Sequence, residues 1–205
     1  MDLDDAIRNR RSIRKFKDKQ VTKAQILEIL DSGNRAPSAK NRVQWRFHIF
    51  QGEAKKRLVK VCREAIDKMP KIPLMASTHN SYNIMEQAPV VILVLQTCEW
   101  GGISPEIQSV SAAIQNMLLK AYSLGLGTVW INDVLFVEPA IMEILNSEKL
   151  ESETQTILLE SSKQLGIEIG FSGPLIAAIA LGYPDEDPKR EPRFKIDELI
   201  TWYNK

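Results

Sequence analysis

Two runs of residues without a polar side chain most constrain the fold of this chain. The first, residues 89–95, is rich in β-branched residues, and no polar residue alternates with them. This pattern predicts a central strand buried on both faces. The second, residues 175–181, predicts a last strand before a turn over residues 182–185. Both runs fall far short of the roughly 20 residues that span a bilayer. We therefore expect no membrane segment.

Apolar residues at helical spacing predict helices around these strands. Thr22 and Gln25 fit a capping box and Gly33 follows the last apolar position, so one helix is expected over residues 23–32. The same periodicity predicts further helices over residues 3–7, 53–68, 107–124 and 139–145.

Two shorter patterns predict the remaining strands. Trp45, Phe47 and Ile49 alternate with polar residues, which indicates a strand with one buried face and with His48 pointing outward. Another strand is expected over residues 126–131. We predict an α+β fold, a mixed central sheet sandwiched by helices. No repeat or linker divides the 205 residues, so we expect a single domain over residues 1–205.

Composition removes several function classes. The net charge of +1 gives no bulk attraction to nucleic acid. Cys62 and Cys98 are expected to be buried core thiols, and neither they nor the two histidines have the spacing of a metal site. The first residues lack the features of a secretory signal, so a cytoplasmic location is expected.

The local charge is less even. Residues 8–19 hold seven cations and one anion. One interpretation is a solvated helix end balanced by Asp2, Asp4 and Asp5; the other is an anion site. Two arginine forks and a hydroxyl within one turn, contributed by Arg10, Arg11 and Ser12, suit a phosphate monoester. A nucleic-acid arm is disfavoured because Ile13 and Phe16 look like core anchors.

The common nucleotide motifs are missing from the sequence. No G-x-G-x-x-G follows an expected strand, and no G-x-x-x-x-G-K-[ST] occurs, so neither a Rossmann nor a P-loop site is supported. The turn-rich loop at residues 36–41 offers a hydroxyl and an amide, and composition alone leaves it either a plain loop or part of a site.

Five strings in one order make the chain resemble the FMN-dependent nitroreductase family. They are Arg-Arg-Ser-Ile-Arg-Lys-Phe at 10–16, Ala-Pro-Ser-Ala-Lys-Asn at 36–41, Ala-Pro-Val-Val-Ile at 88–92, the segment 113–131, and Leu-Gly-Tyr-Pro at 181–184 with Arg193. The resemblance spans residues 3 to about 200. It implies an interlocked homodimer of α+β subunits with two FMN molecules at the subunit interface.

The resemblance also implies roles for particular residues. Arg10, Arg11, Ser12 and Arg193 match positions that bind the FMN phosphate. Arg14 falls where the family places a cation beside the flavin pyrimidine edge, and such a cation stabilises the charge that reduction puts there.

Two more groups of residues are carried over from the family. One is a loop that contacts FMN, partly from the partner subunit: Pro37, Ser38, Ala39 and Asn41. The other surrounds the flavin ring: Asn80 is the candidate edge amide, while Asn132 and Asp133 would approach N5 through their backbone. The family usually reads Asn-x-Gln-Pro-Trp after the loop, whereas this chain has Asn41-Arg-Val-Gln-Trp45, so a different turn is expected around Val43 and Gln44.

The activity implied by the resemblance is a ping-pong oxidoreductase. NAD(P)H would give a hydride to flavin N5, and a flat acceptor such as a nitroarene or quinone would then take it. A flavin-binding sensor or storage protein without turnover is the alternative, and a nucleic-acid module using residues 8–19 is a third. Residues 100–106 and 147–173 match no known specificity.

Overall fold

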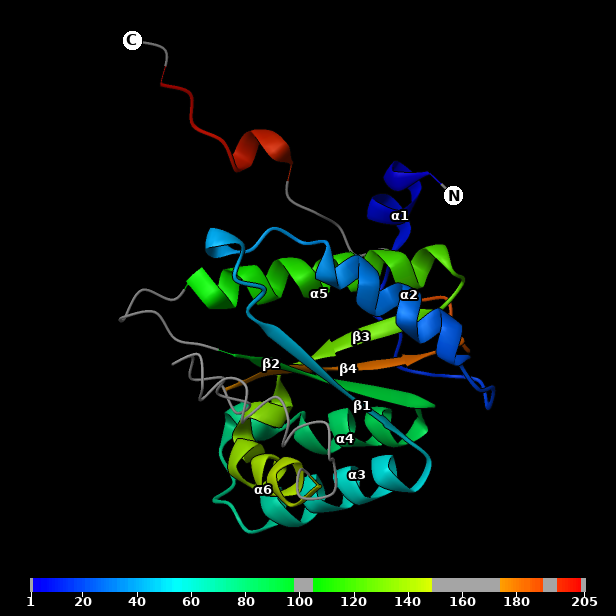
Figure 1. Ribbon diagram of the computed structural model, residues 1–205, viewed down its shortest axis with the longest axis vertical. Coiled ribbons are helices and arrows are strands. Elements are labelled where there is room, and N and C mark those ends of the chain that lie inside the picture. The colour runs from blue at the N-terminus through cyan, green and yellow to red at the C-terminus, as the bar shows by residue number, and fades with distance from the viewer. Residues whose placement is uncertain (1, 98–104, 149–173, 190–194, 204–205) are drawn as a thin grey trace, which may run out of the picture.

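A computed structural model shows a four-stranded sheet between two layers of helices (Figure 1). It describes residues 2–97, 105–148, 174–189 and 195–203. The strands are β1 (Trp45–Gln51), β2 (Val90–Gln96), β3 (Gly127–Ile131) and β4 (Leu175–Gly182), in the order β1-β2-β4-β3. All three neighbouring pairs are antiparallel. The predicted mixed sheet is therefore wrong for the described strands, where parallel pairing is limited to a bridge between Ser12 and Thr128.

Helices cover both faces of the sheet, as predicted (Figure 1). On one side lie α1 (Leu3–Asn9), α2 (Lys23–Asn34) and α5 (Pro105–Ser123). On the other lie α3 (Gly52–Asp67), α4 (Thr78–Gln87) and α6 (Glu138–Glu148). Short 3-10 turns complete the described elements: η1 (Ala39–Asn41), η2 (Pro73–Met75), η3 (Asp133–Val137) and η5 (Ile196–Glu198). Within these residues no helix is both long and apolar enough to cross a membrane.

Strand β2 lies at the centre of the core, and its burial on both faces confirms the prediction. Val90, Ile92 and Val94 pack in one apolar cluster with residues of α2 and α5. Val91, Leu93 and Leu95 pack in the other with residues of α3, α4 and α6. Because successive strand residues point to opposite faces, an unbroken apolar run is what two helical layers require.

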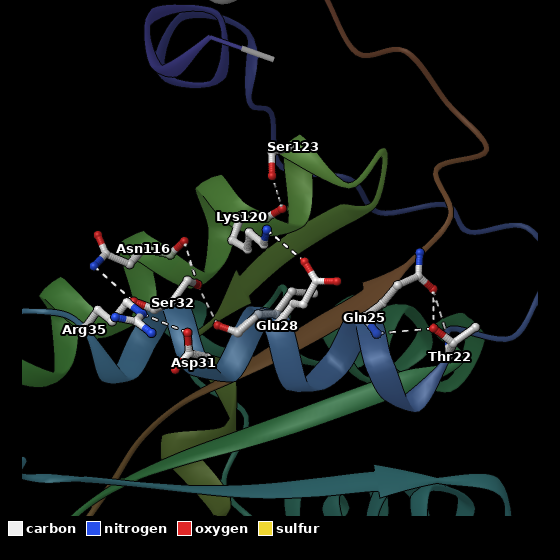
Figure 2. A network of polar contacts seen from close by, with 10 residues as sticks. Thr22, Gln25, Glu28, Asp31, Ser32, Arg35, Asn116, Lys120 and Ser123 are labelled. Carbon is white, nitrogen blue, oxygen red and sulfur yellow. Dashed lines mark hydrogen bonds and ion pairs between the residues drawn. The ribbon is translucent and has the colours of Figure 1, made fainter.

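Helices α2 and α5 are in close contact. The capping box of Thr22 and Gln25 is present as predicted, but α2 continues through Gly33 instead of ending before it. A Cβ on Gly33 would lie 2.7 Å from Cγ of Met117, so this glycine provides room for α5. Figure 2 shows polar contacts of α2 and α5, including the ion pair of Lys120 with Glu28 at 2.9 Å.

Strand β1 is less one-sided than its alternation indicates. Trp45 is buried, but Ile49 on the same face is exposed, and Phe50 on the face of His48 is buried against α3. His48 itself is half-buried. The outward direction expected for His48 is therefore wrong, because α3 covers that face of the strand.

Cys62 and helix α4 both lie on the α3 side of the sheet. Cys62 is fully buried, as expected, and burial raises the pKa of its thiol to about 12; Cys98 lies outside the described residues. Helix α4 was not predicted. Its sequence, THNSYNIMEQ, contains few apolar residues, and its helical state depends on packing of Tyr82 and Met85 in the core.

Candidate functional site

The basic segment, residues 10–17, lies alongside the start of β3 and the turn after β4. Ile13 donates its backbone N–H to the Thr128 carbonyl at 2.9 Å, and Lys17 donates to the Tyr183 carbonyl at 2.9 Å. Ile13 and Phe16 are buried, which confirms them as core anchors. Two apolar side chains thus fasten the segment while the charged residues between them remain at the surface.

Two arginines of the segment, Arg10 and Arg11, adjoin a cavity of about 260 Å³. Arg10 and Arg11 line it together with Tyr122 from the end of α5 and Thr128 from β3. Nη1 of Arg11 donates to the carbonyls of Arg8 and Arg10 at 2.9 and 2.8 Å. A cavity beside two arginines suits a small anion.

The acidic residues expected to balance this charge do so only in part. Asp4 pairs with Arg8 at 3.8 Å, and Asp5 accepts from Asn9 at 2.7 Å. Both contacts stay within the first helix. The contacts of Asp4 and Asp5 are thus with Arg8 and Asn9 of the same helix.

The loop at residues 37–41 lies at the other end of α5. The backbone N–H of Ala39 donates to Oγ of Ser109 at 3.1 Å, near the start of that helix. Oγ of Ser38 accepts from the backbone N–H of Val43 at 3.1 Å. The loop is therefore fixed both to α5 and to the approach to β1.

This loop carries backbone strain. Lys40, Asn41 and Val43 all have φ of 54°, in the left-handed region that non-glycine residues rarely adopt. A β-branched residue there is a clear outlier, and each such residue costs of order 1–3 kcal/mol. The strain falls where the sequence departs from the family pattern, and Gln44 beside it is buried. Strain held in a surface loop is typical of functional sites.

The two groups of site residues are far apart within one chain. The basic segment adjoins Tyr122 and the loop adjoins Ser109, so they lie toward opposite ends of α5. This helix has 19 residues, which corresponds to about 28 Å at 1.5 Å per residue. Figure 1 shows α5 running the length of the sheet.

The turn after β3 is linked to α4. Oδ2 of Asp133 accepts from Oγ of Ser81 at 2.6 Å and from Oγ of Ser77 at 3.2 Å. The hydroxyl of Tyr82 donates to the Asp133 carbonyl at 3.2 Å. Asn80, next to Ser81, is exposed. The Asp133 carboxylate therefore faces α4, which brings the turn and the helix of Asn80 together.

The other member of this turn, Asn132, is exposed, and its Oδ1 accepts from Nε1 of Trp130 at 2.7 Å. Ser12 lies beside Thr128 at the start of β3, and Asn132 follows the end of the same strand. Strand β3 is at the edge of the sheet. The basic segment and the turn thus lie along one sheet edge.

Comparison with known proteins identifies the family of this chain. Residues 7–159 match the sequence profile of the Nitroreductase family. The chain belongs to the nitroreductase family. A protein of Methanothermobacter thermautotrophicus, provisionally named an NADH dehydrogenase/NAD(P)H nitroreductase, is 32% identical over 200 residues, covering 97% of this chain and 86% of the relative. The family resemblance seen in the sequence is confirmed.

Solved structures agree with this assignment. A protein from Desulfovibrio desulfuricans, provisionally named a nitroreductase and solved in complex with FMN, is 26% identical, with a TM-score of 0.69 over 99% of this chain and 97% of its own. An FMN- and NADPH-dependent nitroreductase from a Sphingopyxis strain is 19% identical, with a TM-score of 0.74 and full coverage of both chains; this likeness concerns the fold alone. The predicted α+β nitroreductase-like fold is confirmed.

For two residues, the structure of this nitroreductase-family chain differs from the site predicted from its sequence or does not describe it. Arg193, expected to join Arg10 at the phosphate, lies outside the described residues. Glu186 was not predicted, although its carboxylate accepts from the backbone N–H groups of Arg14 and Lys15. It directly follows the Leu-Gly-Tyr-Pro-Asp string, but no sequence pattern indicates a contact with residues so distant in the chain.

Proposed function

We propose that this chain is an FMN-dependent oxidoreductase that uses NAD(P)H to reduce a flat electron acceptor such as a nitroarene, a quinone or a similar molecule. The observation that carries the proposal is the fastening of the basic segment at the start of β3, where Arg10 and Arg11 open onto a cavity. This position suits the FMN phosphate, because arginine donates paired, permanently charged hydrogen bonds to phosphate oxygens. Arg193 is proposed as a further phosphate ligand.

The remaining cofactor contacts are proposed along the edge of β3. With the phosphate near Ser12, the flavin ring would extend toward Asn132 and Asp133, whose turn offers backbone groups. Arg14 would stabilise the charge of the reduced ring, and Asn80 would contact its edge. When bound, FMN would supply hydride transfer through its N5 between NAD(P)H and the acceptor, as a ping-pong cycle requires.

We further propose a homodimer in which each site takes residues from both chains. Pro37, Ser38, Ala39 and Asn41 adjoin Ser109, which lies about 20 Å along α5 from Tyr122 beside the basic segment. A two-fold axis crossing α5 would bring the loop of one chain to the basic segment of the other. The half-buried Ser111 and Ala112 on α5 allow a close approach at such a crossing.

The C-terminal segment adds support for the dimer. Residues 195–203 extend away from the sheet on the α5 side (Figure 1). Their apolar side chains are exposed: Ile196, Leu199, Ile200, Trp202 and Tyr203. Exposed large apolar side chains gathered in one segment favour an interaction site, and a second copy of the chain is the partner that the α5 argument also favours.

The test is a spectrum followed by reduction. We expect the purified protein to show the visible absorbance of bound flavin, and anaerobic mixing with NADH or NADPH to bleach it. Addition of a nitroarene or a quinone should then restore the oxidised spectrum. Flavin that binds but is not bleached would indicate a sensor or storage protein, and a colourless protein with no affinity for FMN would overturn the proposal.

A further inference from the structure

Glu186 connects the basic segment to the turn after β4. Its Oε1 accepts from the backbone N–H of Arg14 at 2.5 Å and from that of Lys15 at 3.2 Å. Two backbone hydrogen bonds continue the connection: Asp185 donates to the Lys15 carbonyl at 2.9 Å, and Lys17 donates to Tyr183. The backbone around Arg14 is thus held by a residue 172 positions away.

The contacts of this carboxylate are unusual for a residue among so many cations. Glu186 lines the cavity with Arg10 and Arg11, yet the described contacts of its carboxylate are the two backbone N–H groups. A residue serving only to balance charge would pair with a guanidinium. Instead, the backbone N–H groups of Arg14 and Lys15 both donate to one carboxylate oxygen of Glu186. Because a carboxylate accepts strongly from such donors, these two bonds fix the backbone conformation at Arg14 and Lys15.

We propose that Glu186 is a positioning residue of the cofactor site. By occupying the amides of Arg14 and Lys15, it sets the backbone from which the Arg14 guanidinium projects. It also prevents these two amides from binding an anion themselves, so that the phosphate is left to Arg10, Arg11 and Ser12. The inference rests on the proposed function, because it concerns residues that are expected to bind FMN.

Three variants separate hydrogen bonding from charge. E186A removes the acceptor and the charge, E186Q keeps an acceptor oxygen without the charge, and D185N removes a neighbouring charge whose contact with Lys15 is made by the backbone. Apoprotein would be titrated with FMN by flavin fluorescence, and the flavin midpoint potential would be measured. Losing two hydrogen bonds of charged character should raise the Kd of E186A at least about tenfold and make its potential more negative. E186Q, which keeps a weaker acceptor, should bind FMN more weakly than wild type but clearly more tightly than E186A, and D185N should stay within about threefold of the wild-type Kd.

The outcomes are distinguishable. Equal FMN affinity of E186A and wild type, or an E186Q as weak as E186A, would overturn the positioning role while leaving the proposed function intact. If the wild type does not bind FMN, the proposed function fails and this inference fails with it. Urea unfolding of each apoprotein shows whether E186A folds. If it does not, E186D, which retracts the acceptor by one methylene, should bind at least about fivefold more weakly than E186Q, and the reverse order would overturn the role.

Discussion

Gly127 and Gly182 are cross-strand partners at the end of the β3–β4 pair, and the basic segment packs over both. A Cβ on Gly127 would lie 2.8 Å from Cβ of Ile13, and a Cβ on Gly182 would lie 2.9 Å from Cδ1 of Phe16. The absence of two side chains thus provides the space in which both anchors of the segment are seated.

We expect Gly127→Ala to destabilise the protein by about 1–3 kcal/mol, the usual cost of overpacking, because Ile13 must move. Urea unfolding of the variant measures this. Ile13→Ala removes two of the clashing carbon atoms, so the double variant should lose less stability than the sum of the single changes. Strict additivity would show that the two residues are not in contact.

Arg10→Ala should weaken FMN binding far more than folding. A hydrogen bond to a charged group contributes about 1.5–3 kcal/mol, so the Kd should rise by about ten- to a hundredfold. Titration of apoprotein with FMN gives the value. Lys60→Ala, on α3 at the opposite side of the sheet, is the matched control and should bind FMN normally. An unchanged affinity would remove Arg10 from the phosphate site.

Arg14→Ala should change the flavin potential more than the affinity for oxidised FMN. A cation beside the ring stabilises the anionic reduced form preferentially, and about 30 mV corresponds to 1.4 kcal/mol for a two-electron couple. Loss of one partly screened interaction should therefore move the midpoint tens of millivolts negative. Spectroelectrochemistry measures the shift. A midpoint that stays in place or moves positive would assign Arg14 another role.

A chain ending at residue 194 should form a weaker dimer. Burial of one large apolar side chain contributes about 1.5–3 kcal/mol, so removing the exposed apolar residues of the C-terminal segment should raise the dimer dissociation constant well over tenfold. Sedimentation equilibrium of full and shortened chains, with and without FMN, provides the comparison. Stripping FMN should also loosen the full-length dimer, because binding and association are linked. A holo monomer at micromolar concentration would contradict the proposed dimer.

Stability should fall at alkaline pH because of Cys62. Burial raises the pKa of this thiol to about 12, whereas an unfolded thiol titrates near 8.5. The folded state therefore retains a proton that the unfolded state loses, and stability that is complete below about pH 8.5 decreases as pH rises toward 12, by at most about 1.4 kcal/mol per unit. Burial also raises the pKa of Tyr82, which adds to the loss above pH 10. Urea unfolding at pH 7.5, 9 and 10.5 should show a flatter decline for Cys62→Ala.

The elements that could be predicted are those encoded locally. The apolar runs identified β2 and β4, and the capping box identified the start of α2, because burial and capping leave a signal within a few residues. The end of α2 was misplaced because Gly33 serves contact with Met117, which is distant in sequence. Helix α4 was missed because its polar sequence becomes helical through tertiary packing.

Some residues of the candidate site could likewise be predicted from the sequence, and others could not. The charges of Arg10 and Arg14 and the turn-rich loop are visible as composition, so the amino-acid sequence alone singles them out. Glu186 is not visible in this way, because its role is a hydrogen bond across 172 residues. Nor does composition indicate that Val43 adopts a left-handed backbone, since a β-branched residue is the last expected there.

The length of α5 restricts how this protein can evolve. One end of the helix adjoins the basic segment and the other adjoins the loop at residues 37–41. Inserting or deleting one residue would shift one end by about 1.5 Å and rotate it by about 100° relative to the other. Such a change would misalign both sites of the proposed dimer at once. Surface loops absorb such changes readily. Among homologues, insertions and deletions should therefore accumulate in the loops, while α5 keeps its length even where its sequence diverges.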